Sequence, residues 1–191
     1  YIIDIYERRP DMRVVKQSAG RSINLALSAR GIEALKNIGI FGEIQPSLLP
    51  MKGRMIHDMD GKTHLQPYGQ KEDEVVYSVS RAFLNKNLMD LVERTGNVKI
   101  HFDHSLENID INNSELIFKN NKKISFNRVM GSDGSSSCIR KCINERSSMN
   151  FRKNPLGHGY KELSIPATKN GDFKIDPEAL HIWPRGEFML I

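Results

Sequence analysis

The sequence predicts an α/β fold in which helices alternate with short strands. An apolar strand pattern at residues 1–7 ends in an acid, and a capped amphipathic helix pattern covers residues 80–93. A third signal is an apolar run at residues 129–130 that leads through a glycine-rich turn into another helix pattern. Strands that feed helices through short turns are typical of α/β domains, so we expect a central sheet with helices packed against it.

The composition excludes several classes of function. With 191 residues the chain can form one domain or slightly more, and its net charge of +5 comes from scattered basic residues. Only 7% of the residues are aromatic, which argues against a nucleic-acid surface. No apolar run approaches the ~20 residues of a membrane span, so we expect no membrane segment in this stretch and a cytoplasmic location, or an organelle surface if an anchor lies outside it.

The cysteines and histidines do not predict a metal site. Cys138 and Cys142 stand one helical turn apart and are expected to be reduced thiols. His101 and His104 are expected on opposite faces of a strand because their separation is odd.

The strongest local signal is the stretch Gly131–Arg140, which contains the spacing Asp-Gly-x-x-Ser-x-x-Arg. Gly131 and Gly134 would let the backbone approach a ligand, and the first-turn amides of the following helix would face an anion. Asp133, expected at the end of a strand, would accept a hydrogen bond from a sugar hydroxyl. The alternative is a plain strand-to-helix turn whose serines cap the helix.

The first strand ends at Glu7, followed by Arg8 and Arg9. In dinucleotide-binding folds an acid at the end of the second strand binds the adenosine ribose, about 20 residues after a glycine-rich loop. No such loop precedes Glu7, so we expect the chain to be a piece of a longer protein. An edge strand with a solvated glutamate is the alternative.

Two further stretches present residues that could border a ligand. Gly20–Ser28 combines a turn with a short strand, and its Arg21 and Ala26 could flank a flat ligand, although Ala26 could equally pack in the core. Ser28 is expected to cap a helix that ends at Gly39. Arg81 follows the capping residue of the helix over 80–93, where the helix dipole disfavours a cation, which suggests a nearby anion such as a pyrophosphate unless solvation explains it.

Asp60–Gly61 signals a β-hairpin over residues 54–68. A two-residue loop would pair Arg54 with Pro67, whereas a three-residue loop, Asp60–Lys62, would set Arg54 directly against Tyr68. An arginine beside a phenol on a sheet face would bind a carboxylate, so we predict the longer loop. A surface arginine beside a half-buried tyrosine is the alternative.

The remaining pattern predicts mostly strands. Residues 98–102, 106–111, 115–118 and 124–130 read as a run of short strands joined by Asn-rich turns, which returns to the central sheet at Val129. Residues 151–155 read as a linker, 158–165 as a strand, and 181–191 as two strands around a Pro-Arg-Gly turn.

A resemblance rests on several of these stretches taken together. They are Tyr-Glu-Arg-Arg at 6–9, Gly-Arg-Ser-Ile-Asn-Leu-Ala-Leu-Ser at 20–28, Arg-Met-Ile-His at 54–57, Pro-Tyr-Gly at 67–69, Ser-Val-Ser-Arg at 78–81, the Asp133 motif, His-Gly-Tyr at 158–160 and His-Ile-Trp-Pro-Arg at 181–185. The Asp133 motif resembles the second fingerprint of single-component flavoprotein aromatic hydroxylases, and the whole set is similar to the kynurenine 3-monooxygenase family.

The resemblance implies a partial Rossmann-like FAD-binding domain at 1–150, with a hairpin at 53–69 facing the substrate site and an inserted β-meander at 98–127. Residues 151–191 would begin a mostly antiparallel substrate-domain sheet. The family implies hydroxylation of L-kynurenine to 3-hydroxykynurenine with NADPH and O₂ through a flavin C4a-hydroperoxide, a step of tryptophan catabolism that leads to NAD biosynthesis.

Carried over by motif, Arg54 and Tyr68 would bind the substrate carboxylate, while no side chain is identified as acid or base and the oligomeric state stays open. The stretch alone is expected to hold FAD weakly and to be inactive. The alternatives are a related flavin hydroxylase of phenolic acids and a non-catalytic flavin-fold binding module. The expected cofactor-binding residues are Tyr6, Glu7, Arg8, Arg9, Ala26, Arg81, Leu106, Asp133, Gly134 and Cys138.

Overall fold

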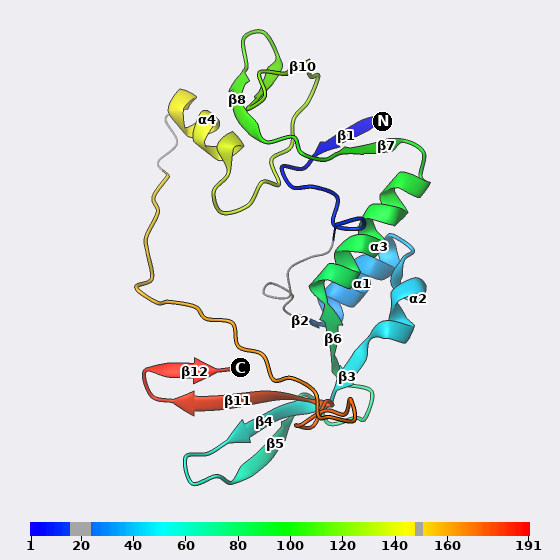
Figure 1. Ribbon diagram of the computed structural model, residues 1–191, viewed down its shortest axis with the longest axis vertical. Coiled ribbons are helices and arrows are strands. Elements are labelled where there is room, and N and C mark those ends of the chain that lie inside the picture. The colour runs from blue at the N-terminus through cyan, green and yellow to red at the C-terminus, as the bar shows by residue number, and fades with distance from the viewer. Residues whose placement is uncertain (16–23, 148–150) are drawn as a thin grey trace. The chain divides into compact units, whose positions relative to one another are not determined.

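The computed structural model describes residues 1–15, 24–147 and 151–191 and confirms a mixed α/β fold (Figure 1). The Gly20–Ile23 part of the predicted turn, with Arg21, lies outside the described residues. The chain forms two compact units. The first unit comprises Tyr1–Gln17 and Val92–Tyr160, and the second comprises Ser18–Leu91 and Lys161–Ile191. The functional division into 1–150 and 151–191 stays a prediction.

The first unit contains a parallel strand pair, β1 (Ile3–Tyr6) and β7 (Val98–His101), in the register Ile3↔Val98 to Tyr6↔His101. Both strands were expected from their apolar patterns. Because the strands are parallel, their carboxyl ends lie at the same edge, where the Glu7 amide donates to the His101 carbonyl at 2.9 Å. Glu7 therefore stands where ligands bind in open α/β sheets.

The predicted meander forms an antiparallel sheet of order β10-β9-β8 (Figure 1). Its buried core residues also contact α4 (Cys138–Arg146), through Cys142. The Asn-rich turns are confirmed, with positive φ at Ser114 and Asn121. The strands are β8 (Leu106–Asp110), β9 (Glu115–Phe118) and β10 (Lys123–Ser125).

The expected return to the sheet at Val129 is wrong. The last strand of the meander ends at Ser125, and residues 126–137 form neither strand nor helix. A strand needs a ladder partner, and no strand of the described residues pairs with this stretch. Phe126 and Val129 instead pack against the core of the meander. Asp133 consequently stands in a loop and not at the end of a strand.

The second unit contains an antiparallel sheet of order β2-β6-β3 and a helical layer. Ser28 takes the N-cap position of α1 without a side-chain hydrogen bond, and Gly39 closes the helix with a φ of 76°. Leu35, Ile40 and Ile44 are buried against apolar residues that include Leu84 and Leu88 of α3. The elements are β2 (Asn24–Leu27), α1 (Ala29–Asn37), α2 (Phe41–Ile44), the 3₁₀ helix η1 (Gln45–Ser47), β3 (Leu49–Met51), β6 (Val76–Ser80) and α3 (Arg81–Arg94), whose last turn belongs to the first unit.

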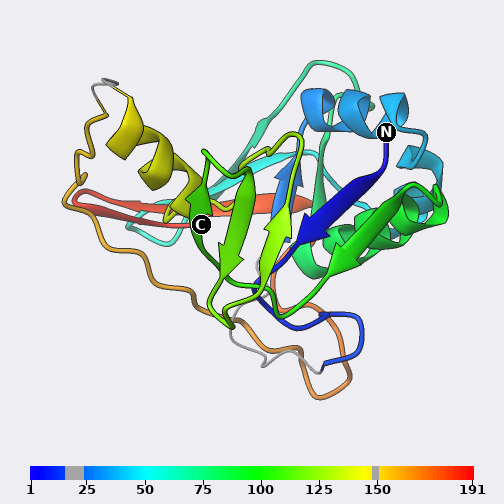
Figure 2. The same cartoon turned by 90° about the horizontal axis from the view of Figure 1, so that it is seen from above.

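A second sheet of this unit has the order β12-β11-β4-β5. It joins the predicted hairpin, β4 (Gly53–His57) and β5 (Thr63–Pro67), to the end of the chain through parallel pairing of β4 with β11 (Ala179–Arg185). Figure 2 shows β11 and β12 (Phe188–Leu190) as the red hairpin beside these strands. Residues more than a hundred positions apart in the sequence therefore share one sheet.

The predicted hairpin register is wrong by a small shift. The loop has three residues, as expected, but they are Met59–Gly61, because the amide of Asp58 donates to the carbonyl of Lys62 at 2.9 Å. Gly61 takes the last loop position with a φ of 86°, which favours glycine. Arg54 consequently pairs with Gln66.

Two predictions for the end of the chain need correction. Residues 158–165 form no strand and are exposed, because alternation alone supplies no ladder partner. The turn after β11 consists of Gly186 and Glu187, since Arg185 already pairs with Phe188. Among the described residues, no helix has the length and apolar character that crossing a membrane requires.

Candidate functional site

The end of β1 presents the residues predicted to bind adenosine. The Tyr6 ring stacks on His101 with centroids 4.8 Å apart and contacts Phe118 at 5.1 Å. Burial, helped by the nearby Asp4 carboxylate, raises the pKa of Tyr6 above its usual value, so the phenol stays protonated. Tyr6 therefore supports the strand end through packing.

Glu7 follows directly and is half-buried. Its Oε1 accepts a hydrogen bond from the Arg9 amide at 2.9 Å, whereas Oε2 has no partner among the described residues. Arg8 and Arg9 are exposed. The strand end thus offers one unoccupied carboxylate oxygen, followed in the chain by two exposed cations.

The prediction that His101 and His104 point to opposite faces is wrong, because their ring centroids are 5.8 Å apart and both contact Tyr6. Asp103, with a φ of 58°, turns the chain after β7 and breaks the alternation. His104 Nδ1 lies 2.6 Å from the Phe102 carbonyl and must donate to it, so Nε2 accepts from Lys122 at 3.3 Å. The structure thus places the His104 ring against Tyr6 at the strand end.

Asp133 organises its own loop. Its Oδ1 accepts from the Ser137 hydroxyl at 2.5 Å, and its Oδ2 accepts from the amides of Cys138 and Ile139 at 2.6 and 3.2 Å. Burial alone would raise the pKa of Asp133, but these hydrogen bonds outweigh it and lower the pKa below the usual value. With about four acceptor positions on a carboxylate, one position on Oδ1 is left for a ligand.

The first-turn amides of α4 are not available as an anion site. Ser137 caps the helix by accepting from the Arg140 amide at 2.9 Å, and Asp133 holds the two preceding amides. The Arg140 guanidinium turns back to the Gly134 and Ser135 carbonyls. The capping role considered for this motif is therefore observed, and Gly134, with a φ of 80°, supplies the tight turn that it requires.

The predicted residues of the first unit converge on one core. Tyr6, Leu106 and Cys138 all pack against the buried cluster that contains Phe118 and Cys142. Leu106 opens β8, and the Cys138 thiol lies 3.1 Å from the Glu107 carbonyl. This core links the strand end at Glu7 to the Asp133 loop.

In the second unit, Arg54 and Tyr68 lie on the same face of the sheet although the predicted register is wrong. Arg54 pairs with Gln66, and Tyr68 stands two residues further along the same face. The Arg54 Cζ is 5.6 Å from the centre of the Tyr68 ring. Arg54 is exposed and has no acidic partner among the described residues, so its guanidinium remains available to an anion.

Ala26 lies on β2 of the other sheet of the second unit, and Arg81 directly follows β6 of that sheet. Ala26 is exposed and pairs with Ser78, so it does not pack in the core. Arg81 opens α3 immediately after Ser80, whose Oγ accepts from the Phe83 amide at 3.4 Å and caps the helix as expected. Arg81 has partners of its own in the structure, so it is not an isolated cation.

The sequence interpretation missed a histidine cluster on the face of the β12-β11-β4-β5 sheet opposite to Arg54. His57 Nε2 lies 2.7 Å from His181 Nδ1, and His181 Nε2 lies 2.8 Å from the Asp176 carbonyl. The His57 ring also stacks on Trp183 at 4.1 Å. The alternation of His181 and Trp183 in the His-Ile-Trp motif could have revealed a shared face, but their partner strand is distant in the sequence.

The chain is similar in sequence to known proteins. No family model matches it. It is 41% identical over its whole length to a kynurenine 3-monooxygenase of Myxococcus xanthus, of which it covers 42%. It is 39% identical to a kynurenine 3-monooxygenase of Anopheles gambiae, with 99% of the chain and 40% of the relative covered.

Solved structures show the same fold at low sequence identity. A probable FAD-dependent monooxygenase of Pseudomonas aeruginosa, PqsL, matches 82% of the chain and 41% of its own length with a TM-score of 0.59 and 13% identity. The flavin-dependent monooxygenase PieE matches 74% of the chain and 27% of its own length, with a TM-score of 0.57 and 14% identity. The chain thus has a partial fold of flavin-dependent monooxygenases and is homologous, over its whole length, to about two fifths of proteins named kynurenine 3-monooxygenase.

Proposed function

We propose that a protein carrying this chain is an FAD-dependent monooxygenase that hydroxylates L-kynurenine to 3-hydroxykynurenine with NADPH and O₂. The observation that carries the proposal is the similarity to kynurenine 3-monooxygenases, which extends through the entire chain. The chain spans less than half of these relatives, so the activity belongs to a protein that also supplies the rest of the fold.

The end of β1 fits the adenosine half of FAD. Oε2 of Glu7 is unoccupied at the carboxyl edge of a parallel strand pair, where it can accept from ribose hydroxyls, and the exposed Arg8 and Arg9 can flank the ribose and pyrophosphate. Bound FAD would supply the oxygen-activating chemistry and accept the reducing equivalents of NADPH. Leu106 and Tyr6 would support this site from their common core.

The Asp133 loop fits a supporting role near the same cofactor. Its carboxylate fixes the start of α4, and one acceptor position on Oδ1 remains for a ribityl hydroxyl. Gly134 lacks a side chain and adopts a positive φ, so the loop backbone can approach a ligand closely. The Cys138 thiol holds the loop to β8 through its contact with the Glu107 carbonyl.

Arg54 and Tyr68 fit the amino-acid carboxylate of kynurenine. The guanidinium lies over the phenol ring, with Cζ 5.6 Å from the ring centre, and a guanidinium can form two parallel hydrogen bonds with a carboxylate. The role of these residues is to orient the substrate ring by its side chain while the reaction proceeds at the cofactor. The same pair would also accept other aromatic acids, which is why the substrate needs a direct test.

The test uses a protein that carries this chain within the full length of its relatives. NADPH oxidation should accelerate on addition of L-kynurenine, and mass spectrometry should find a product heavier by one oxygen atom. A phenolic acid such as 4-hydroxybenzoate serves as the comparison. Acceleration and hydroxylation with the phenolic acid but not with kynurenine would favour a different flavin hydroxylase, and the absence of bound FAD would favour a non-catalytic flavin-fold module.

A further inference from the structure

We propose that Arg13 is a positioning residue for the adenosine end of the FAD site, an inference that rests on the proposed function. Arg13 belongs to the segment that follows β1 and that contains Glu7, Arg8 and Arg9. This segment forms neither strand nor helix over residues 7–15, so its shape depends on side-chain contacts.

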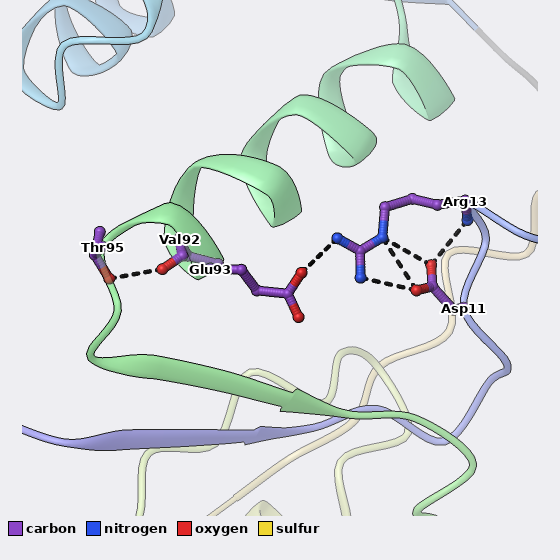
Figure 3. Close-up of polar contacts among 5 residues, drawn as sticks. All are labelled: Asp11, Arg13, Val92, Glu93 and Thr95. Carbon is purple, nitrogen blue, oxygen red and sulfur yellow. Dashed lines mark hydrogen bonds and ion pairs between the residues drawn. The ribbon is translucent and has the colours of Figure 1, made fainter.

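Arg13 joins two acidic side chains, as Figure 3 shows. Its Nε lies 3.0 and 3.1 Å from the two carboxylate oxygens of Asp11, and its Nη2 lies 2.8 Å from Oδ2. Its Nη1 donates to Oε2 of Glu93 at 2.6 Å. The guanidinium also lies 5.7 Å from the centre of the Phe102 ring.

These contacts differ from an ordinary surface ion pair. The side chains of Arg13 and Asp11 are only 22% and 19% exposed, so the pair is partly shielded from water and from salt. The two acids hold the guanidinium in a fixed plane because several of its donors are used at once. The cluster therefore fixes the position of the Arg13 side chain as well as neutralising its charge.

The position of Glu93 supports a specific role for the cluster. Glu93 lies in the last turn of α3, where the helix dipole disfavours a negative charge. The helix ends just beyond it, where the Thr95 hydroxyl donates to the Val92 carbonyl at 2.6 Å. An acid at this unfavourable position is explained by the arginine that it binds.

The cluster gives the segment of residues 7–15 its second attachment to the rest of the first unit. On one side, the amide of Glu7 donates to the His101 carbonyl and the amide of Asp103 donates to the Arg9 carbonyl, at 2.9 and 3.1 Å. On the other side, Arg13 ties the segment to α3. Pro10, Asp11 and Met12 lie between the Arg9 contact and Arg13, so loss of the second attachment would free the chain beyond Arg9 and loosen the Arg9 amide that donates to the Glu7 carboxylate.

The experiment measures affinity for FAD and for ADP, which carries only the adenosine half, in a protein that contains this chain at the full length of its relatives. Arg13→Met should raise the Kd of FAD by about tenfold, and it should raise the inhibition constant of ADP against FAD by a similar factor. Arg13→Lys, which keeps the charge but loses the planar fork, should give an intermediate effect. Flavin fluorescence reports binding without any requirement for turnover.

Lys123→Met is the matched control, because it breaks an ion pair with Glu115 at 3.3 Å in the meander and removes the same charge. It should leave both constants unchanged. If Arg13→Met does not fold, Glu93→Gln carries the test, since it leaves the Asp11 pair intact. The inference would be overturned if FAD affinity is unchanged in these variants, or if FAD affinity is weakened while ADP affinity is unchanged. Either outcome would leave the proposed function standing. A wild-type protein that binds no FAD would overturn the proposed function and this inference with it.

Discussion

The guanidinium of Arg54 lies over the ring of Tyr68, with Cζ 5.6 Å from the ring centre, although the two residues are not direct cross-strand partners. They meet diagonally because residues two apart on a strand share a face. Because Arg54 is exposed and has no acidic partner among the described residues, its guanidinium can still bind a carboxylate through two parallel hydrogen bonds.

Substitution of this pair should therefore affect substrate affinity more than turnover. We expect Arg54→Met to raise the KM for kynurenine by roughly 10- to 100-fold, since a charged hydrogen-bonded pair contributes about 1.5–3 kcal/mol. Tyr68→Phe keeps the aromatic ring under the guanidinium and should raise the KM for kynurenine by a smaller factor. Steady-state kinetics of NADPH oxidation measures both, with Lys62→Met as the control for loss of a loop cation. An unchanged KM in Arg54→Met would remove Arg54 from the substrate site.

The hairpin illustrates how far the sequence could predict this site. The Asp60–Gly61 signal located the turn, and the expectation that Arg54 and Tyr68 act together selected the three-residue loop, which places the two side chains on one face. The register failed because the position of Gly61 within the loop depends on backbone conformation, which residue preferences do not fix to a single residue. The partner of Arg54 is two residues away from the predicted one, and a shift of two residues leaves each side chain on the same face of the sheet. Arg54 and Tyr68 therefore still share a face.

The histidine pair on the other face of this sheet predicts a pH dependence of stability. Burial lowers the pKa of His57 below its usual value, with additional lowering by His181 and by the Arg185 guanidinium. The folded state thus binds fewer protons than the unfolded state, so stability is fully present above a pH of about 6.5 and declines as the pH falls through that value.

Thermal unfolding between pH 7.5 and 5.5 measures this effect. The midpoint of the wild-type protein should fall on acidification, and His57→Gln, which cannot titrate, should flatten the dependence. His64→Gln is the matched control, because His64 is an exposed histidine on the neighbouring strand. A pH dependence that is as steep in His57→Gln as in the wild type would assign the effect to other groups.

The sequence placed elements whose partners are local better than elements whose partners are distant. Residues 115–118 and the helix after Ser80 were located closely, since turns and caps signal them. Residues 158–165 alternate like a strand but find no ladder partner among the described residues, and Val129 packs into a core instead of extending a sheet. The Arg13 and His57 clusters could not be predicted from the sequence, because each joins residues that are far apart in the chain.

The Asp133 loop predicts a measurable capping contribution. Asp133→Ala removes the acceptor for the Cys138 and Ile139 amides and should destabilise the protein by about 1 kcal/mol, within the usual range for loss of a helix cap. Because the folded-state pKa of Asp133 is lowered, its contribution is present above a pH of about 4 and is lost as the pH falls further. Urea unfolding of the wild type and of Asp133→Ala at pH 7 and at pH 3 measures the capping contribution and its dependence on pH.

Ser136→Ala is the control for that experiment, because Ser136 lies in the same loop and makes no capping hydrogen bond. It should leave the free energy of unfolding unchanged. Equal destabilisation by Asp133→Ala at both pH values would show that the carboxylate charge is not what holds the helix start.

Cys138 provides a prediction about reactivity next to the same loop. Burial, together with the neighbouring Cys142 thiol and the Asp133 carboxylate, raises the pKa of Cys138 to about 11. The thiolate is the nucleophile, so at pH 8 alkylation of Cys138 should be roughly two orders of magnitude slower than that of an exposed cysteine of ordinary pKa. Cys142→Ser removes one source of the shift and should speed the reaction. Iodoacetamide labelling followed by peptide mass spectrometry measures the rate, and labelling as fast as that of a free cysteine would show that the thiol is not shielded by the Glu107 carbonyl and the core beside it.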